Sequence, residues 1–421
     1  MFSNRLFDTE VDGILDFVPS VSKLQRSTGD DWVDRMNHLY TVILLIIFAI
    51  VVSTGQFVGD PIHCWCPAEF TDAFEAYTES YCWISNTYYI PLSDTIPIDI
   101  KTRQERELTY YQWVPLILLF QAFLFKLPNM VWKLLHSGSG INVNKIVHLS
   151  EDTMLASPDD RKETVDNLAR YMDKWFHTNQ QYKHNIVVRV TNNVSKVCCF
   201  VCNKRAGTYL VGLFMTSKFL YLANAVGQFF MLNAFLSNDW GLFGFEVLQS
   251  LAENKPLRES PKFPRVTLCD FEIRQLQNIQ RWTVQCVLPV NLFNEKIFIF
   301  IWFWLVLIVA LTFFSLLKWM FYYIFQNNKI RFVKKYLKVN NELHTGFDKK
   351  LCARFAQEYL RSDGIFVLFI VAKNASEMVV TDLVKALWKI YKEKHKPSNL
   401  INNIEDHEPK LNEEKELLNE S

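Results

Sequence analysis

The side chains of this chain that could most clearly do chemistry are its cysteines, which can form disulfides, bind metal or carry lipid. The sequence has nine of them among 421 residues. Five lie in two segments between long apolar stretches, 58–112 and 237–296: Cys64, Cys66, Cys82, Cys269 and Cys286. Two bridges among four cysteines allow three connectivities, and spacing does not choose among them. A bridge between Cys64 and Cys66 would be strained because they are so close, so one of these two is expected to be free or to compete for a shared partner.

A second cysteine group, Cys198, Cys199 and Cys202, stands in "CCFVC" next to Lys204 and Arg205. Zinc would need a fourth ligand, and no CxxC or HxxxH partner stands nearby. Two interpretations remain, palmitoylation close to a membrane and ordinary reduced thiols. We expect no metal site and no cofactor.

Patterns typical of enzymes are missing from the sequence. It contains no Walker loop, GxSxG, HExxH or GxGxxG. The formal net charge is +1, so bulk charge does not indicate a nucleic-acid partner. The sequence therefore predicts a protein that is not an enzyme, and its function has to be sought in the elements that position the cysteines.

Those elements are four long apolar segments. They occupy residues 39–57, 113–132, 210–236 and 297–324. A spanning helix needs about 20 such residues, and four runs of this length favour membrane spans over buried core helices. A fifth run, 365–372, is too short to span and predicts a buried helix of a soluble part. We therefore predict an all-α polytopic membrane protein with four transmembrane helices. No cleavable signal peptide is visible, so the first run should act as an anchor.

Basic residues near the span ends predict the orientation. Residues 58–112 contain three Lys/Arg and nine Asp/Glu, whereas residues 133–209 contain eleven and seven. The basic sides should be cytoplasmic. This places 1–38, 133–209 and 325–421 inside and the loops 58–112 and 237–296 outside, where disulfides persist.

Polar residues inside the third apolar segment are informative, because they cost free energy in lipid and usually face protein or water. They include Lys218, Asn224 and Gln228. Asn224 and Gln228 are four positions apart and share a helix face. They could line a pore, and the alternative is hydrogen bonding between helices.

The stretch "YYQWVP" stands at the expected outer end of the second span. It consists of Tyr110, Tyr111, Gln112, Trp113, Val114 and Pro115. Its aromatic residues are placed for the interfacial belt of a membrane protein. If the helix begins at Val114, Pro115 falls in its first turn, where no donor is lost. If the helix begins earlier, Pro115 kinks it.

Together with other segments, "YYQWVP" resembles the signature of innexins, the invertebrate gap-junction proteins. The matching segments, in chain order, are "DDWVDRMNHLYT", "GQFVGDPIHCW", "YCWISNTYYIP", "FPRVTLCDF", "VQCVLPVNLFNEKIFIFIWFWL" and "SDGIFVL". The resemblance covers roughly residues 30–388.

The resemblance implies a gap-junction channel at the plasma membrane that passes ions and small solutes between cells. A ring of subunits, an octamer, would dock with a ring on the apposed cell, with other innexins as possible co-subunits and lipid around it. Both termini would be cytoplasmic. The expected bridges join Cys64 to Cys286 and Cys82 to Cys269. The outer loops would contain minor β structure, residues 1–38 a pore funnel, and the cytoplasmic parts a helical dome.

Two departures from the family pattern stand out. Cys66 is extra and could shuffle bridges or act as a redox-sensitive thiol. The amino-terminal segment is the least family-like part, and it is interpreted either as a short amphipathic helix or as an interfacial or disordered leader. Its acidic residues near a pore mouth would favour cations: Asp8, Glu10, Asp12 and Asp16.

Two other functions remain open. The chain could work mainly as an undocked hemichannel that releases small molecules such as ATP. It could also be a non-conducting four-span scaffold of the tetraspanin or claudin type, although its inner loop and tail are large for such a protein. The acidic carboxyl-terminal end is expected to be a solvated tail.

Overall fold

The structure, a computed structural model, describes residues 31–154, 156–178, 207–236, 240–253, 262–343 and 346–394. The chain divides into two compact units. We call residues 33–130 and 218–315 the bundle unit. The other unit, Met1–Trp32, Val131–Ser217 and Leu316–Ser421, is called the helical unit. The candidate pore-mouth and palmitoylation residues lie outside the described residues: Asp8, Glu10, Asp12, Asp16, Cys198, Cys199 and Cys202.

Four helical segments are long and apolar enough to cross a membrane. They are Trp32–Phe57, Tyr111–Ser139, Tyr209–Phe235 and Val290–Ile324. The first joins α2 (Trp32–Arg35), a π-helical stretch (Met36–Tyr40) and α3 (Thr41–Phe57). The second is mainly α6 (Val114–His136), between 3-10 turns at Tyr111–Trp113 and Ser137–Ser139, and the last two are α10 (Tyr209–Phe235) and α12 (Val290–Ile324). The predicted fold class, a mostly helical chain with four such helices, is confirmed.

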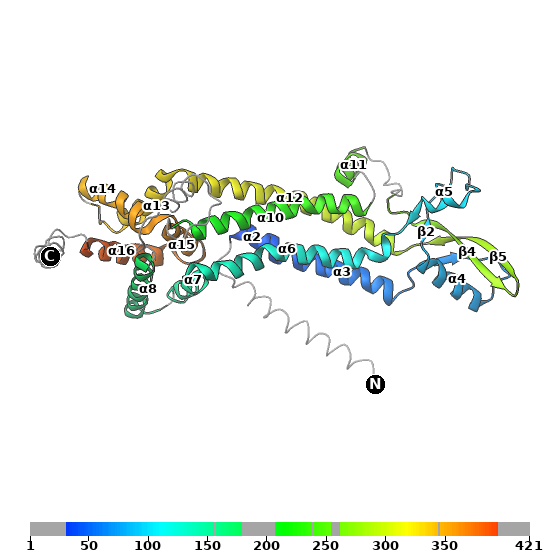
Figure 1. Ribbon diagram of the computed structural model, residues 1–421, viewed down its shortest axis with the longest axis horizontal. Coiled ribbons are helices and arrows are strands. Elements are labelled where there is room, and N and C mark those ends of the chain that lie inside the picture. Colours follow the sequence, from blue (N-terminus) through cyan, green and yellow to red (C-terminus); the bar gives the residue numbers. More distant parts are fainter. Residues whose placement is uncertain are drawn as a thin grey trace, which may run out of the picture. The chain divides into compact units, whose positions relative to one another are not determined.

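Within the bundle unit, α3, α6, α10 and α12 share one apolar core (Figure 1). Spacings of three and four keep its members on one face of each helix. They include Leu45, Ala49 and Val52 of α3, Leu118, Ala122 and Phe125 of α6, Ala225 and Leu232 of α10, and Phe298, Ile301, Leu305 and Ile308 of α12. Large apolar residues elsewhere on these helices, such as Ile50, Phe230 and Phe314, are exposed, which fits a surface that meets lipid.

The rest of the bundle unit includes a small mixed module, which we call the outer module. It contains two helices, α4 (Asp72–Ile84) and α5 (Ile100–Gln104). Its strands are β1 (His63–Trp65), β2 (Thr87–Tyr88), β3 (Glu107–Leu108), β4 (Val266–Gln275) and β5 (Asn278–Val287). They form one antiparallel sheet in the order β1-β5-β4-β2-β3. Figure 1 labels three of these strands, β2, β4 and β5. The minor β structure implied by the family resemblance is therefore present.

The longest strands, β4 and β5, form a hairpin with Leu276 and Gln277 as its two-residue loop. Leu276 has a φ of 55°, a left-handed conformation that such tight loops require and that glycine or asparagine usually supplies. Along β4, buried residues alternate with less buried ones, so that Thr267, Cys269 and Phe271 point to the same covered face.

A further helix of the bundle unit, α11 (Trp240–Ala252), was not predicted from the sequence. Its close approach to α12 depends on Gly244, since a Cβ atom there would overlap the Trp302 ring. Phe243 on the same helix is buried against Phe263. A short helix rich in glycine and aromatic residues carries little amphipathic periodicity, so the pattern alone did not reveal it.

Among its described residues, the helical unit contains only helices in addition to the ends of the spanning segments. They are α7 (Val143–Asp152), α8 (Pro158–Thr178), α13 (Gln326–Val339), α14 (Gly346–Arg354), a π-helical stretch (Phe355–Leu360), α15 (Arg361–Asn374) and α16 (Glu377–Lys394). Residues Ile365 to Leu368 of α15 are all buried, which confirms the predicted buried helix at 365–372.

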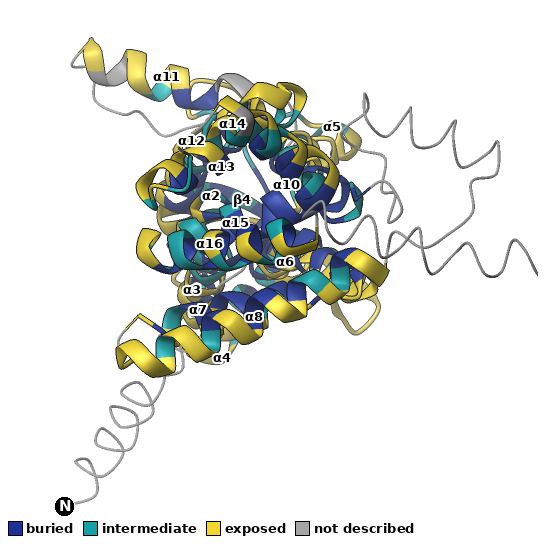
Figure 2. Cartoon of the chain, turned by 90° about the vertical axis from the view of Figure 1, so that its left-hand side faces the viewer, coloured by how far each residue is buried: buried dark blue, intermediate teal, exposed yellow. Residues whose placement is uncertain are grey.

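The sequence of α8 shows why a helix forms there. Ser157 precedes Pro158 at the first position, and its hydroxyl accepts from the Asp160 amide at 3.3 Å. Buried residues then recur every three or four positions: Val165, Leu168, Ala169, Met172 and Phe176. The opposite side of α8 is exposed (Figure 2). Only one face of this helix therefore packs on the core of the unit.

Candidate functional site

The outer module is held together by two disulfides that join segments far apart in the sequence. Cys64 on β1 lies directly opposite Cys286 on β5 and is bonded to it. Cys82 on α4 is bonded to Cys269 on β4. This is the pairing that the family resemblance implies. The bridges attach β1 and α4, which follow the first span, to the hairpin that precedes the fourth.

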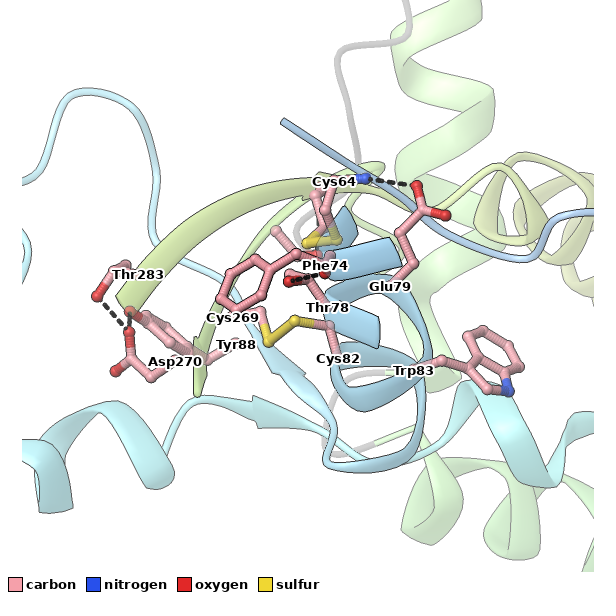
Figure 3. Close-up of a disulfide and its surroundings, with 12 residues drawn as sticks. Cys64, Phe74, Thr78, Glu79, Cys82, Trp83, Tyr88, Cys269, Asp270 and Thr283 are labelled. Atoms are coloured by element: carbon pink, nitrogen blue, oxygen red, sulfur yellow. Dashed lines mark hydrogen bonds between the residues drawn. A yellow bond between two sulfur atoms is a disulfide. The ribbon is translucent and has the colours of Figure 1, made fainter. Parts of the chain in front are cut away.

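The two bridges are close neighbours (Figure 3). The sulfur atoms of Cys64, Cys82 and Cys286 lie within 4.8 Å of one another. Such a cluster resembles a metal site only in its spacing, because metal binding needs thiolates and these sulfurs are bonded in disulfides. The cluster is therefore a covalent core for the module.

Aromatic packing positions α4 on the sheet. Phe74 of α4 contacts Phe271 of β4 with ring centroids 6.4 Å apart, and Tyr81 approaches the same ring at 6.0 Å. Phe70 packs edge-on against Phe74 and against Trp282 of β5, at 4.0 and 5.1 Å. These contacts bury the helix face that carries Cys82, so the bridge forms between elements that already pack.

A polar network lies across the inner strands β5, β4 and β2 of the sheet. The Asp270 carboxylate accepts from the hydroxyls of Tyr88 at 2.9 Å and Thr283 at 2.7 Å (Figure 3). The Arg103 guanidinium donates to the same carboxylate at 2.7 Å. Burial and the neighbouring Asp270 raise the pKa of Tyr88, so its hydroxyl keeps the proton that it donates. Arg103 also donates to the Pro97 carbonyl at 2.6 Å, which ties α5 and the preceding loop to the sheet.

Cys66, the extra cysteine, has a free thiol in the structure. Burial raises the pKa of this thiol, and the carboxylates of Glu75 and Glu79 raise it further, against a lowering hydrogen bond from Thr78. A raised pKa leaves less thiolate at neutral pH, and thiolate is the species that attacks disulfides. Its surroundings therefore disfavour bridge shuffling.

The motif "YYQWVP" occupies the start of the second spanning segment. Because α6 begins at Val114, Pro115 lies in its first turn and leaves no hydrogen bond unmade. The expectation that all its aromatic residues belong to an interfacial belt is wrong for two of them. Tyr110 and Tyr111 are buried within the protein, and only Trp113 is exposed.

Hydrogen bonds to neighbouring elements hold Tyr111, whereas aromatic packing holds Tyr110. The Tyr111 hydroxyl donates to the Trp83 carbonyl at 3.3 Å, and the Gln112 amide donates to the same carbonyl. The Gln56 side chain donates to the Tyr111 carbonyl at 2.7 Å. Tyr110 packs edge-on against Phe263, with centroids 5.6 Å apart. The motif thus joins the ends of α3 and α4 to the start of α6.

A second candidate site is a row of polar residues on the first spanning segment, which we call the polar seam. It consists of Asp34, Asn37, His38 and Thr41, all buried and spaced three or four positions apart. Asn37 donates to Thr312 of α12 at 2.9 Å, and Thr41 accepts from the Trp304 indole at 2.9 Å. His38 stacks on Tyr221 of α10. The seam includes the π-helical stretch, a feature frequent at functional sites.

Lys218, the predicted charge within the third span, belongs to this seam. Its ammonium lies 2.9 Å from the Asp34 carboxylate and donates to the Ser315 hydroxyl at 2.9 Å. The side chain is completely buried. A buried charge is tolerated when it is paired and hydrogen-bonded. Lys218 therefore links the first, third and fourth spanning segments.

Asp34, the charged partner of Lys218, was not predicted, although its helical spacing is visible in the sequence. The stretch "DDWVDRMNHLYT" places polar residues at positions 34, 37, 38 and 41, the helical spacing of one face. The apolar run was begun at residue 39, after the last charge, whereas the helix begins at Trp32.

Asn224 and Gln228 share a helix face as predicted. The Gln228 amide donates to the Asn224 carbonyl oxygen at 3.1 Å. The bond lies within α10, so it is not the interhelical bond that was one alternative. Within the described part of the chain, Asn224 Nδ2 and Gln228 Oε1 find no further partner. Their role in lining a pore stays a prediction.

Comparison with known proteins decides the family. A family model described as Innexin matches residues 30–391. The chain is 40% identical over 375 residues to innexin unc-9 of Caenorhabditis elegans, covering 89% of this chain and 95% of the relative. The chain belongs to the innexin family.

Other innexins agree over similar lengths. Innexin-3 of Caenorhabditis elegans is 36% identical over 364 residues, covering 86% of this chain and 84% of the relative. Innexin-19 of Caenorhabditis briggsae is 34% identical over 402 residues, covering 89% of each. This innexin is therefore a membrane protein and a subunit of a gap-junction channel, and the tetraspanin- or claudin-type alternative is excluded.

Proposed function

We propose that the outer module is the docking face of this innexin, through which a channel in one membrane joins a channel in the next. The observation that carries the proposal is the combination of a rigid, doubly bridged module with apolar side chains exposed on it. Those side chains are Trp65, Ile84, Leu92, Ile98 and Leu276. Exposed apolar side chains gathered on one small module typically mark a contact with another protein.

We also propose the orientation that this docking requires, with both termini and the loop 133–209 in the cytoplasm. The excess of Lys and Arg in 133–209, eleven against seven acidic residues, supports it. The disulfides support it as well, since such bonds persist outside the cell. Antibody access to a tag after Ser421 tests the orientation, because labelling should require permeabilised cells.

The pore itself is proposed from the family. A ring of subunits, an octamer, would enclose it, alone or with other innexins. Residues 1–38 would line the cytoplasmic mouth, where Asp8, Glu10, Asp12 and Asp16 would favour cations. Unchanged cation-to-anion permeability after neutralisation of all four would remove the charge proposal. The role proposed for the protein is passive conduction rather than catalysis.

The docking proposal is tested by Leu276→Asp at the tip of the hairpin, where the side chain is 95% exposed. In paired cells this variant should lose most of the junctional conductance at unchanged surface expression, since a carboxylate is costly in an apolar contact. The matched control is Met378→Asp, an exposed apolar residue at the start of α16 in the helical unit. Equal conductance in both variants would reject docking through the hairpin tip.

A further inference from the structure

A pocket of about 410 Å³ lies in the helical unit, apart from the residues assigned to docking. It is formed by the end of α12, one side of α13, α15 and the first residue of α16. The α13 contribution is Asn328, Arg331, Phe332, Lys335 and Tyr336. These positions follow the spacing of one helix face, so the pocket is a feature of how α13 packs and not of loop placement.

The floor of the pocket is aromatic. Phe369 of α15 stands at its centre, with ring centroids 5.3 Å from Tyr322 and 5.6 Å from Phe332. Phe332 in turn contacts Tyr336 at 5.0 Å. The four rings pack against one another and give the pocket an aromatic, apolar floor.

The rim of the pocket is cationic. It carries Arg331, Lys335 and Lys373 against one acid, Glu377. Among the described residues, Arg331 is exposed and has no ion-pair partner. Lys335 pairs with Glu377 at 2.8 Å, but both side chains are more than half exposed. Exposed pairs are weak, so an anion in the pocket can compete with Glu377.

The third cation of the rim, Lys373, already has an ion-pair partner. Lys373 lies 2.9 Å from Asp31 and stands over the Trp319 and Phe369 rings. It contributes positive potential to the pocket without being freely available. The hydrogen bond to Glu377 raises the pKa of Lys335, so this side chain stays protonated at neutral pH.

The pocket stands at the end of the fourth spanning segment. Tyr322 belongs to the last turn of α12, and its neighbours Phe321, Ile324 and Phe325 are exposed aromatic or apolar residues. Aromatic residues in this position mark the level of lipid headgroups. The helix that follows, α13, has five basic residues and no acidic one. A basic cluster directly after a spanning helix attracts anionic lipid.

We propose that this pocket binds the phosphate-bearing headgroup of an anionic phospholipid, with Arg331 and Lys335 holding the phosphate and Tyr322 and Phe369 contacting its apolar part. The guanidinium of Arg331 is suited to paired hydrogen bonds with phosphate oxygens. The assignment to the inner leaflet rests on the proposed orientation, whereas the phosphate chemistry does not.

Binding is measured on purified, detergent-solubilised full chain with soluble dioctanoyl phosphatidylinositol bisphosphate as the probe. Arg331→Gln and Lys335→Gln should each weaken binding by about fivefold, the effect of one basic residue near an anionic lipid surface. Glu377→Gln should tighten binding, because it removes the competing carboxylate. Arg331→Lys should fall between wild type and Arg331→Gln, since it keeps the charge and loses the fork.

The matched control is Lys334→Gln. Lys334 is exposed on the same helix but does not line the pocket, and its charge is felt at Cys352 on α14. It should bind the probe as wild type does. An equal loss with Lys334→Gln would overturn the site in favour of general charge attraction, as would the absence of binding to the wild type. Unchanged melting temperatures of the variants establish that they fold.

Two further probes distinguish the source of the phosphate. Dioctanoyl phosphatidylcholine should bind at least tenfold more weakly than the anionic lipid. Inositol trisphosphate, which lacks acyl chains, should also bind more weakly, because Tyr322 and Phe369 then contact nothing apolar. Equal binding of inositol trisphosphate would overturn the membrane assignment and leave a site for soluble phosphate. None of these measurements involves conduction, so failure of the docking proposal would not affect them.

Discussion

The outer module and the helical unit are stabilised in different ways. In the outer module, two disulfides join a thin sheet to a short helix. In the described part of the helical unit there is no disulfide, and its free Cys352 is buried. There α15 is enclosed by other helices, and Trp388, Phe355 and Phe366 are completely buried.

The difference follows from how much apolar surface each region can cover. The outer module is small, and small modules bury little apolar surface on folding. Its covalent links compensate for this without covering the exposed apolar side chains that are proposed for docking, such as Leu276. A region with several layers of helices needs no such links. Covalent links thus hold the small module that exposes apolar side chains, and packing alone holds the described part of the helical unit.

Removal of both bridges should have the largest effect on stability and on junctional conductance. The substitutions Cys64→Ser, Cys82→Ser, Cys269→Ser and Cys286→Ser remove links that close loops of 222 and 187 residues. Each native bridge contributes about 2–5 kcal/mol, so the module should unfold and junctional conductance should vanish. The measurement combines thermal melting with paired-cell recording. Wild-type coupling in the quadruple variant would show that packing alone holds the module.

The polar seam should show the next largest effect. Lys218→Met leaves the Asp34 carboxylate buried without the ammonium 2.9 Å away, which should cost about 3–5 kcal/mol. Replacing both partners, Lys218→Met with Asp34→Leu, should recover most of this loss. The control is Lys318→Met, which removes an exposed charge from α12. A double variant as unstable as Lys218→Met would mean that the two side chains do not act as a pair.

Asp363 should make the helical unit sensitive to pH. Its carboxylate accepts from the amides of Tyr209 and Val211 at 2.9 and 3.2 Å, yet burial dominates and raises its pKa from 3.8 to about 6. A raised carboxyl pKa contributes stability that is present below pH 4 and is lost as pH rises through 6. The full change is about 3 kcal/mol at 1.36 kcal/mol per pH unit.

The test of Asp363 is melting temperature at pH 5 and pH 7.5. The wild type should be more stable at pH 5 than at pH 7.5 by about 1.4 kcal/mol of this change, because pH 5 lies one pH unit below the raised pKa of about 6. Asp363→Asn should reduce the difference between the two pH values. The variant isolates this group because other titrating residues contribute equally to both proteins. The same pH dependence in both would show that Asp363 does not titrate in this range.

Cys66→Ser should have the smallest effect. The raised pKa of this thiol disfavours exchange with the adjacent bridges. The free energy of unfolding should change by less than about 0.5 kcal/mol, as is typical of surface substitutions, so the melting temperature should hardly move. Electrical coupling between paired cells should stay at the wild-type level. Scrambled disulfides in the wild type, detected by mass spectrometry and absent from Cys66→Ser, would contradict this.

Much of the fold could be predicted from hydropathy and composition. Four apolar runs gave the spanning helices, and the run at 365–372 gave the buried core of α15. The helix α11 was not predicted. The need for a glycine at position 244 is set by the Trp302 ring, which lies far away in the sequence. Periodicity reports which face is apolar but not what covers it.

The candidate sites were predictable to different degrees. The bridge partners came from family resemblance, since spacing left three connectivities open. Tyr110 and Tyr111 were misplaced because an aromatic residue at a span end can face lipid or protein, and the carbonyl of Trp83 that favours protein is a feature of the fold. Lys218 is noticeable in the sequence because a charge in a membrane span costs free energy in lipid. Its partner Asp34 lies before the apolar run that begins at residue 39, so the sequence did not indicate the pair.

The central claim, that the bridged outer module joins two channels into one, is tested most directly by dual voltage clamp on paired cells. The chain is expressed in both cells, in one or in neither, with surface expression confirmed. Junctional current is expected only when both cells express the chain, and Leu276→Asp should remove most of it. Current in single expressing cells with none between pairs would overturn docking and identify an undocked hemichannel.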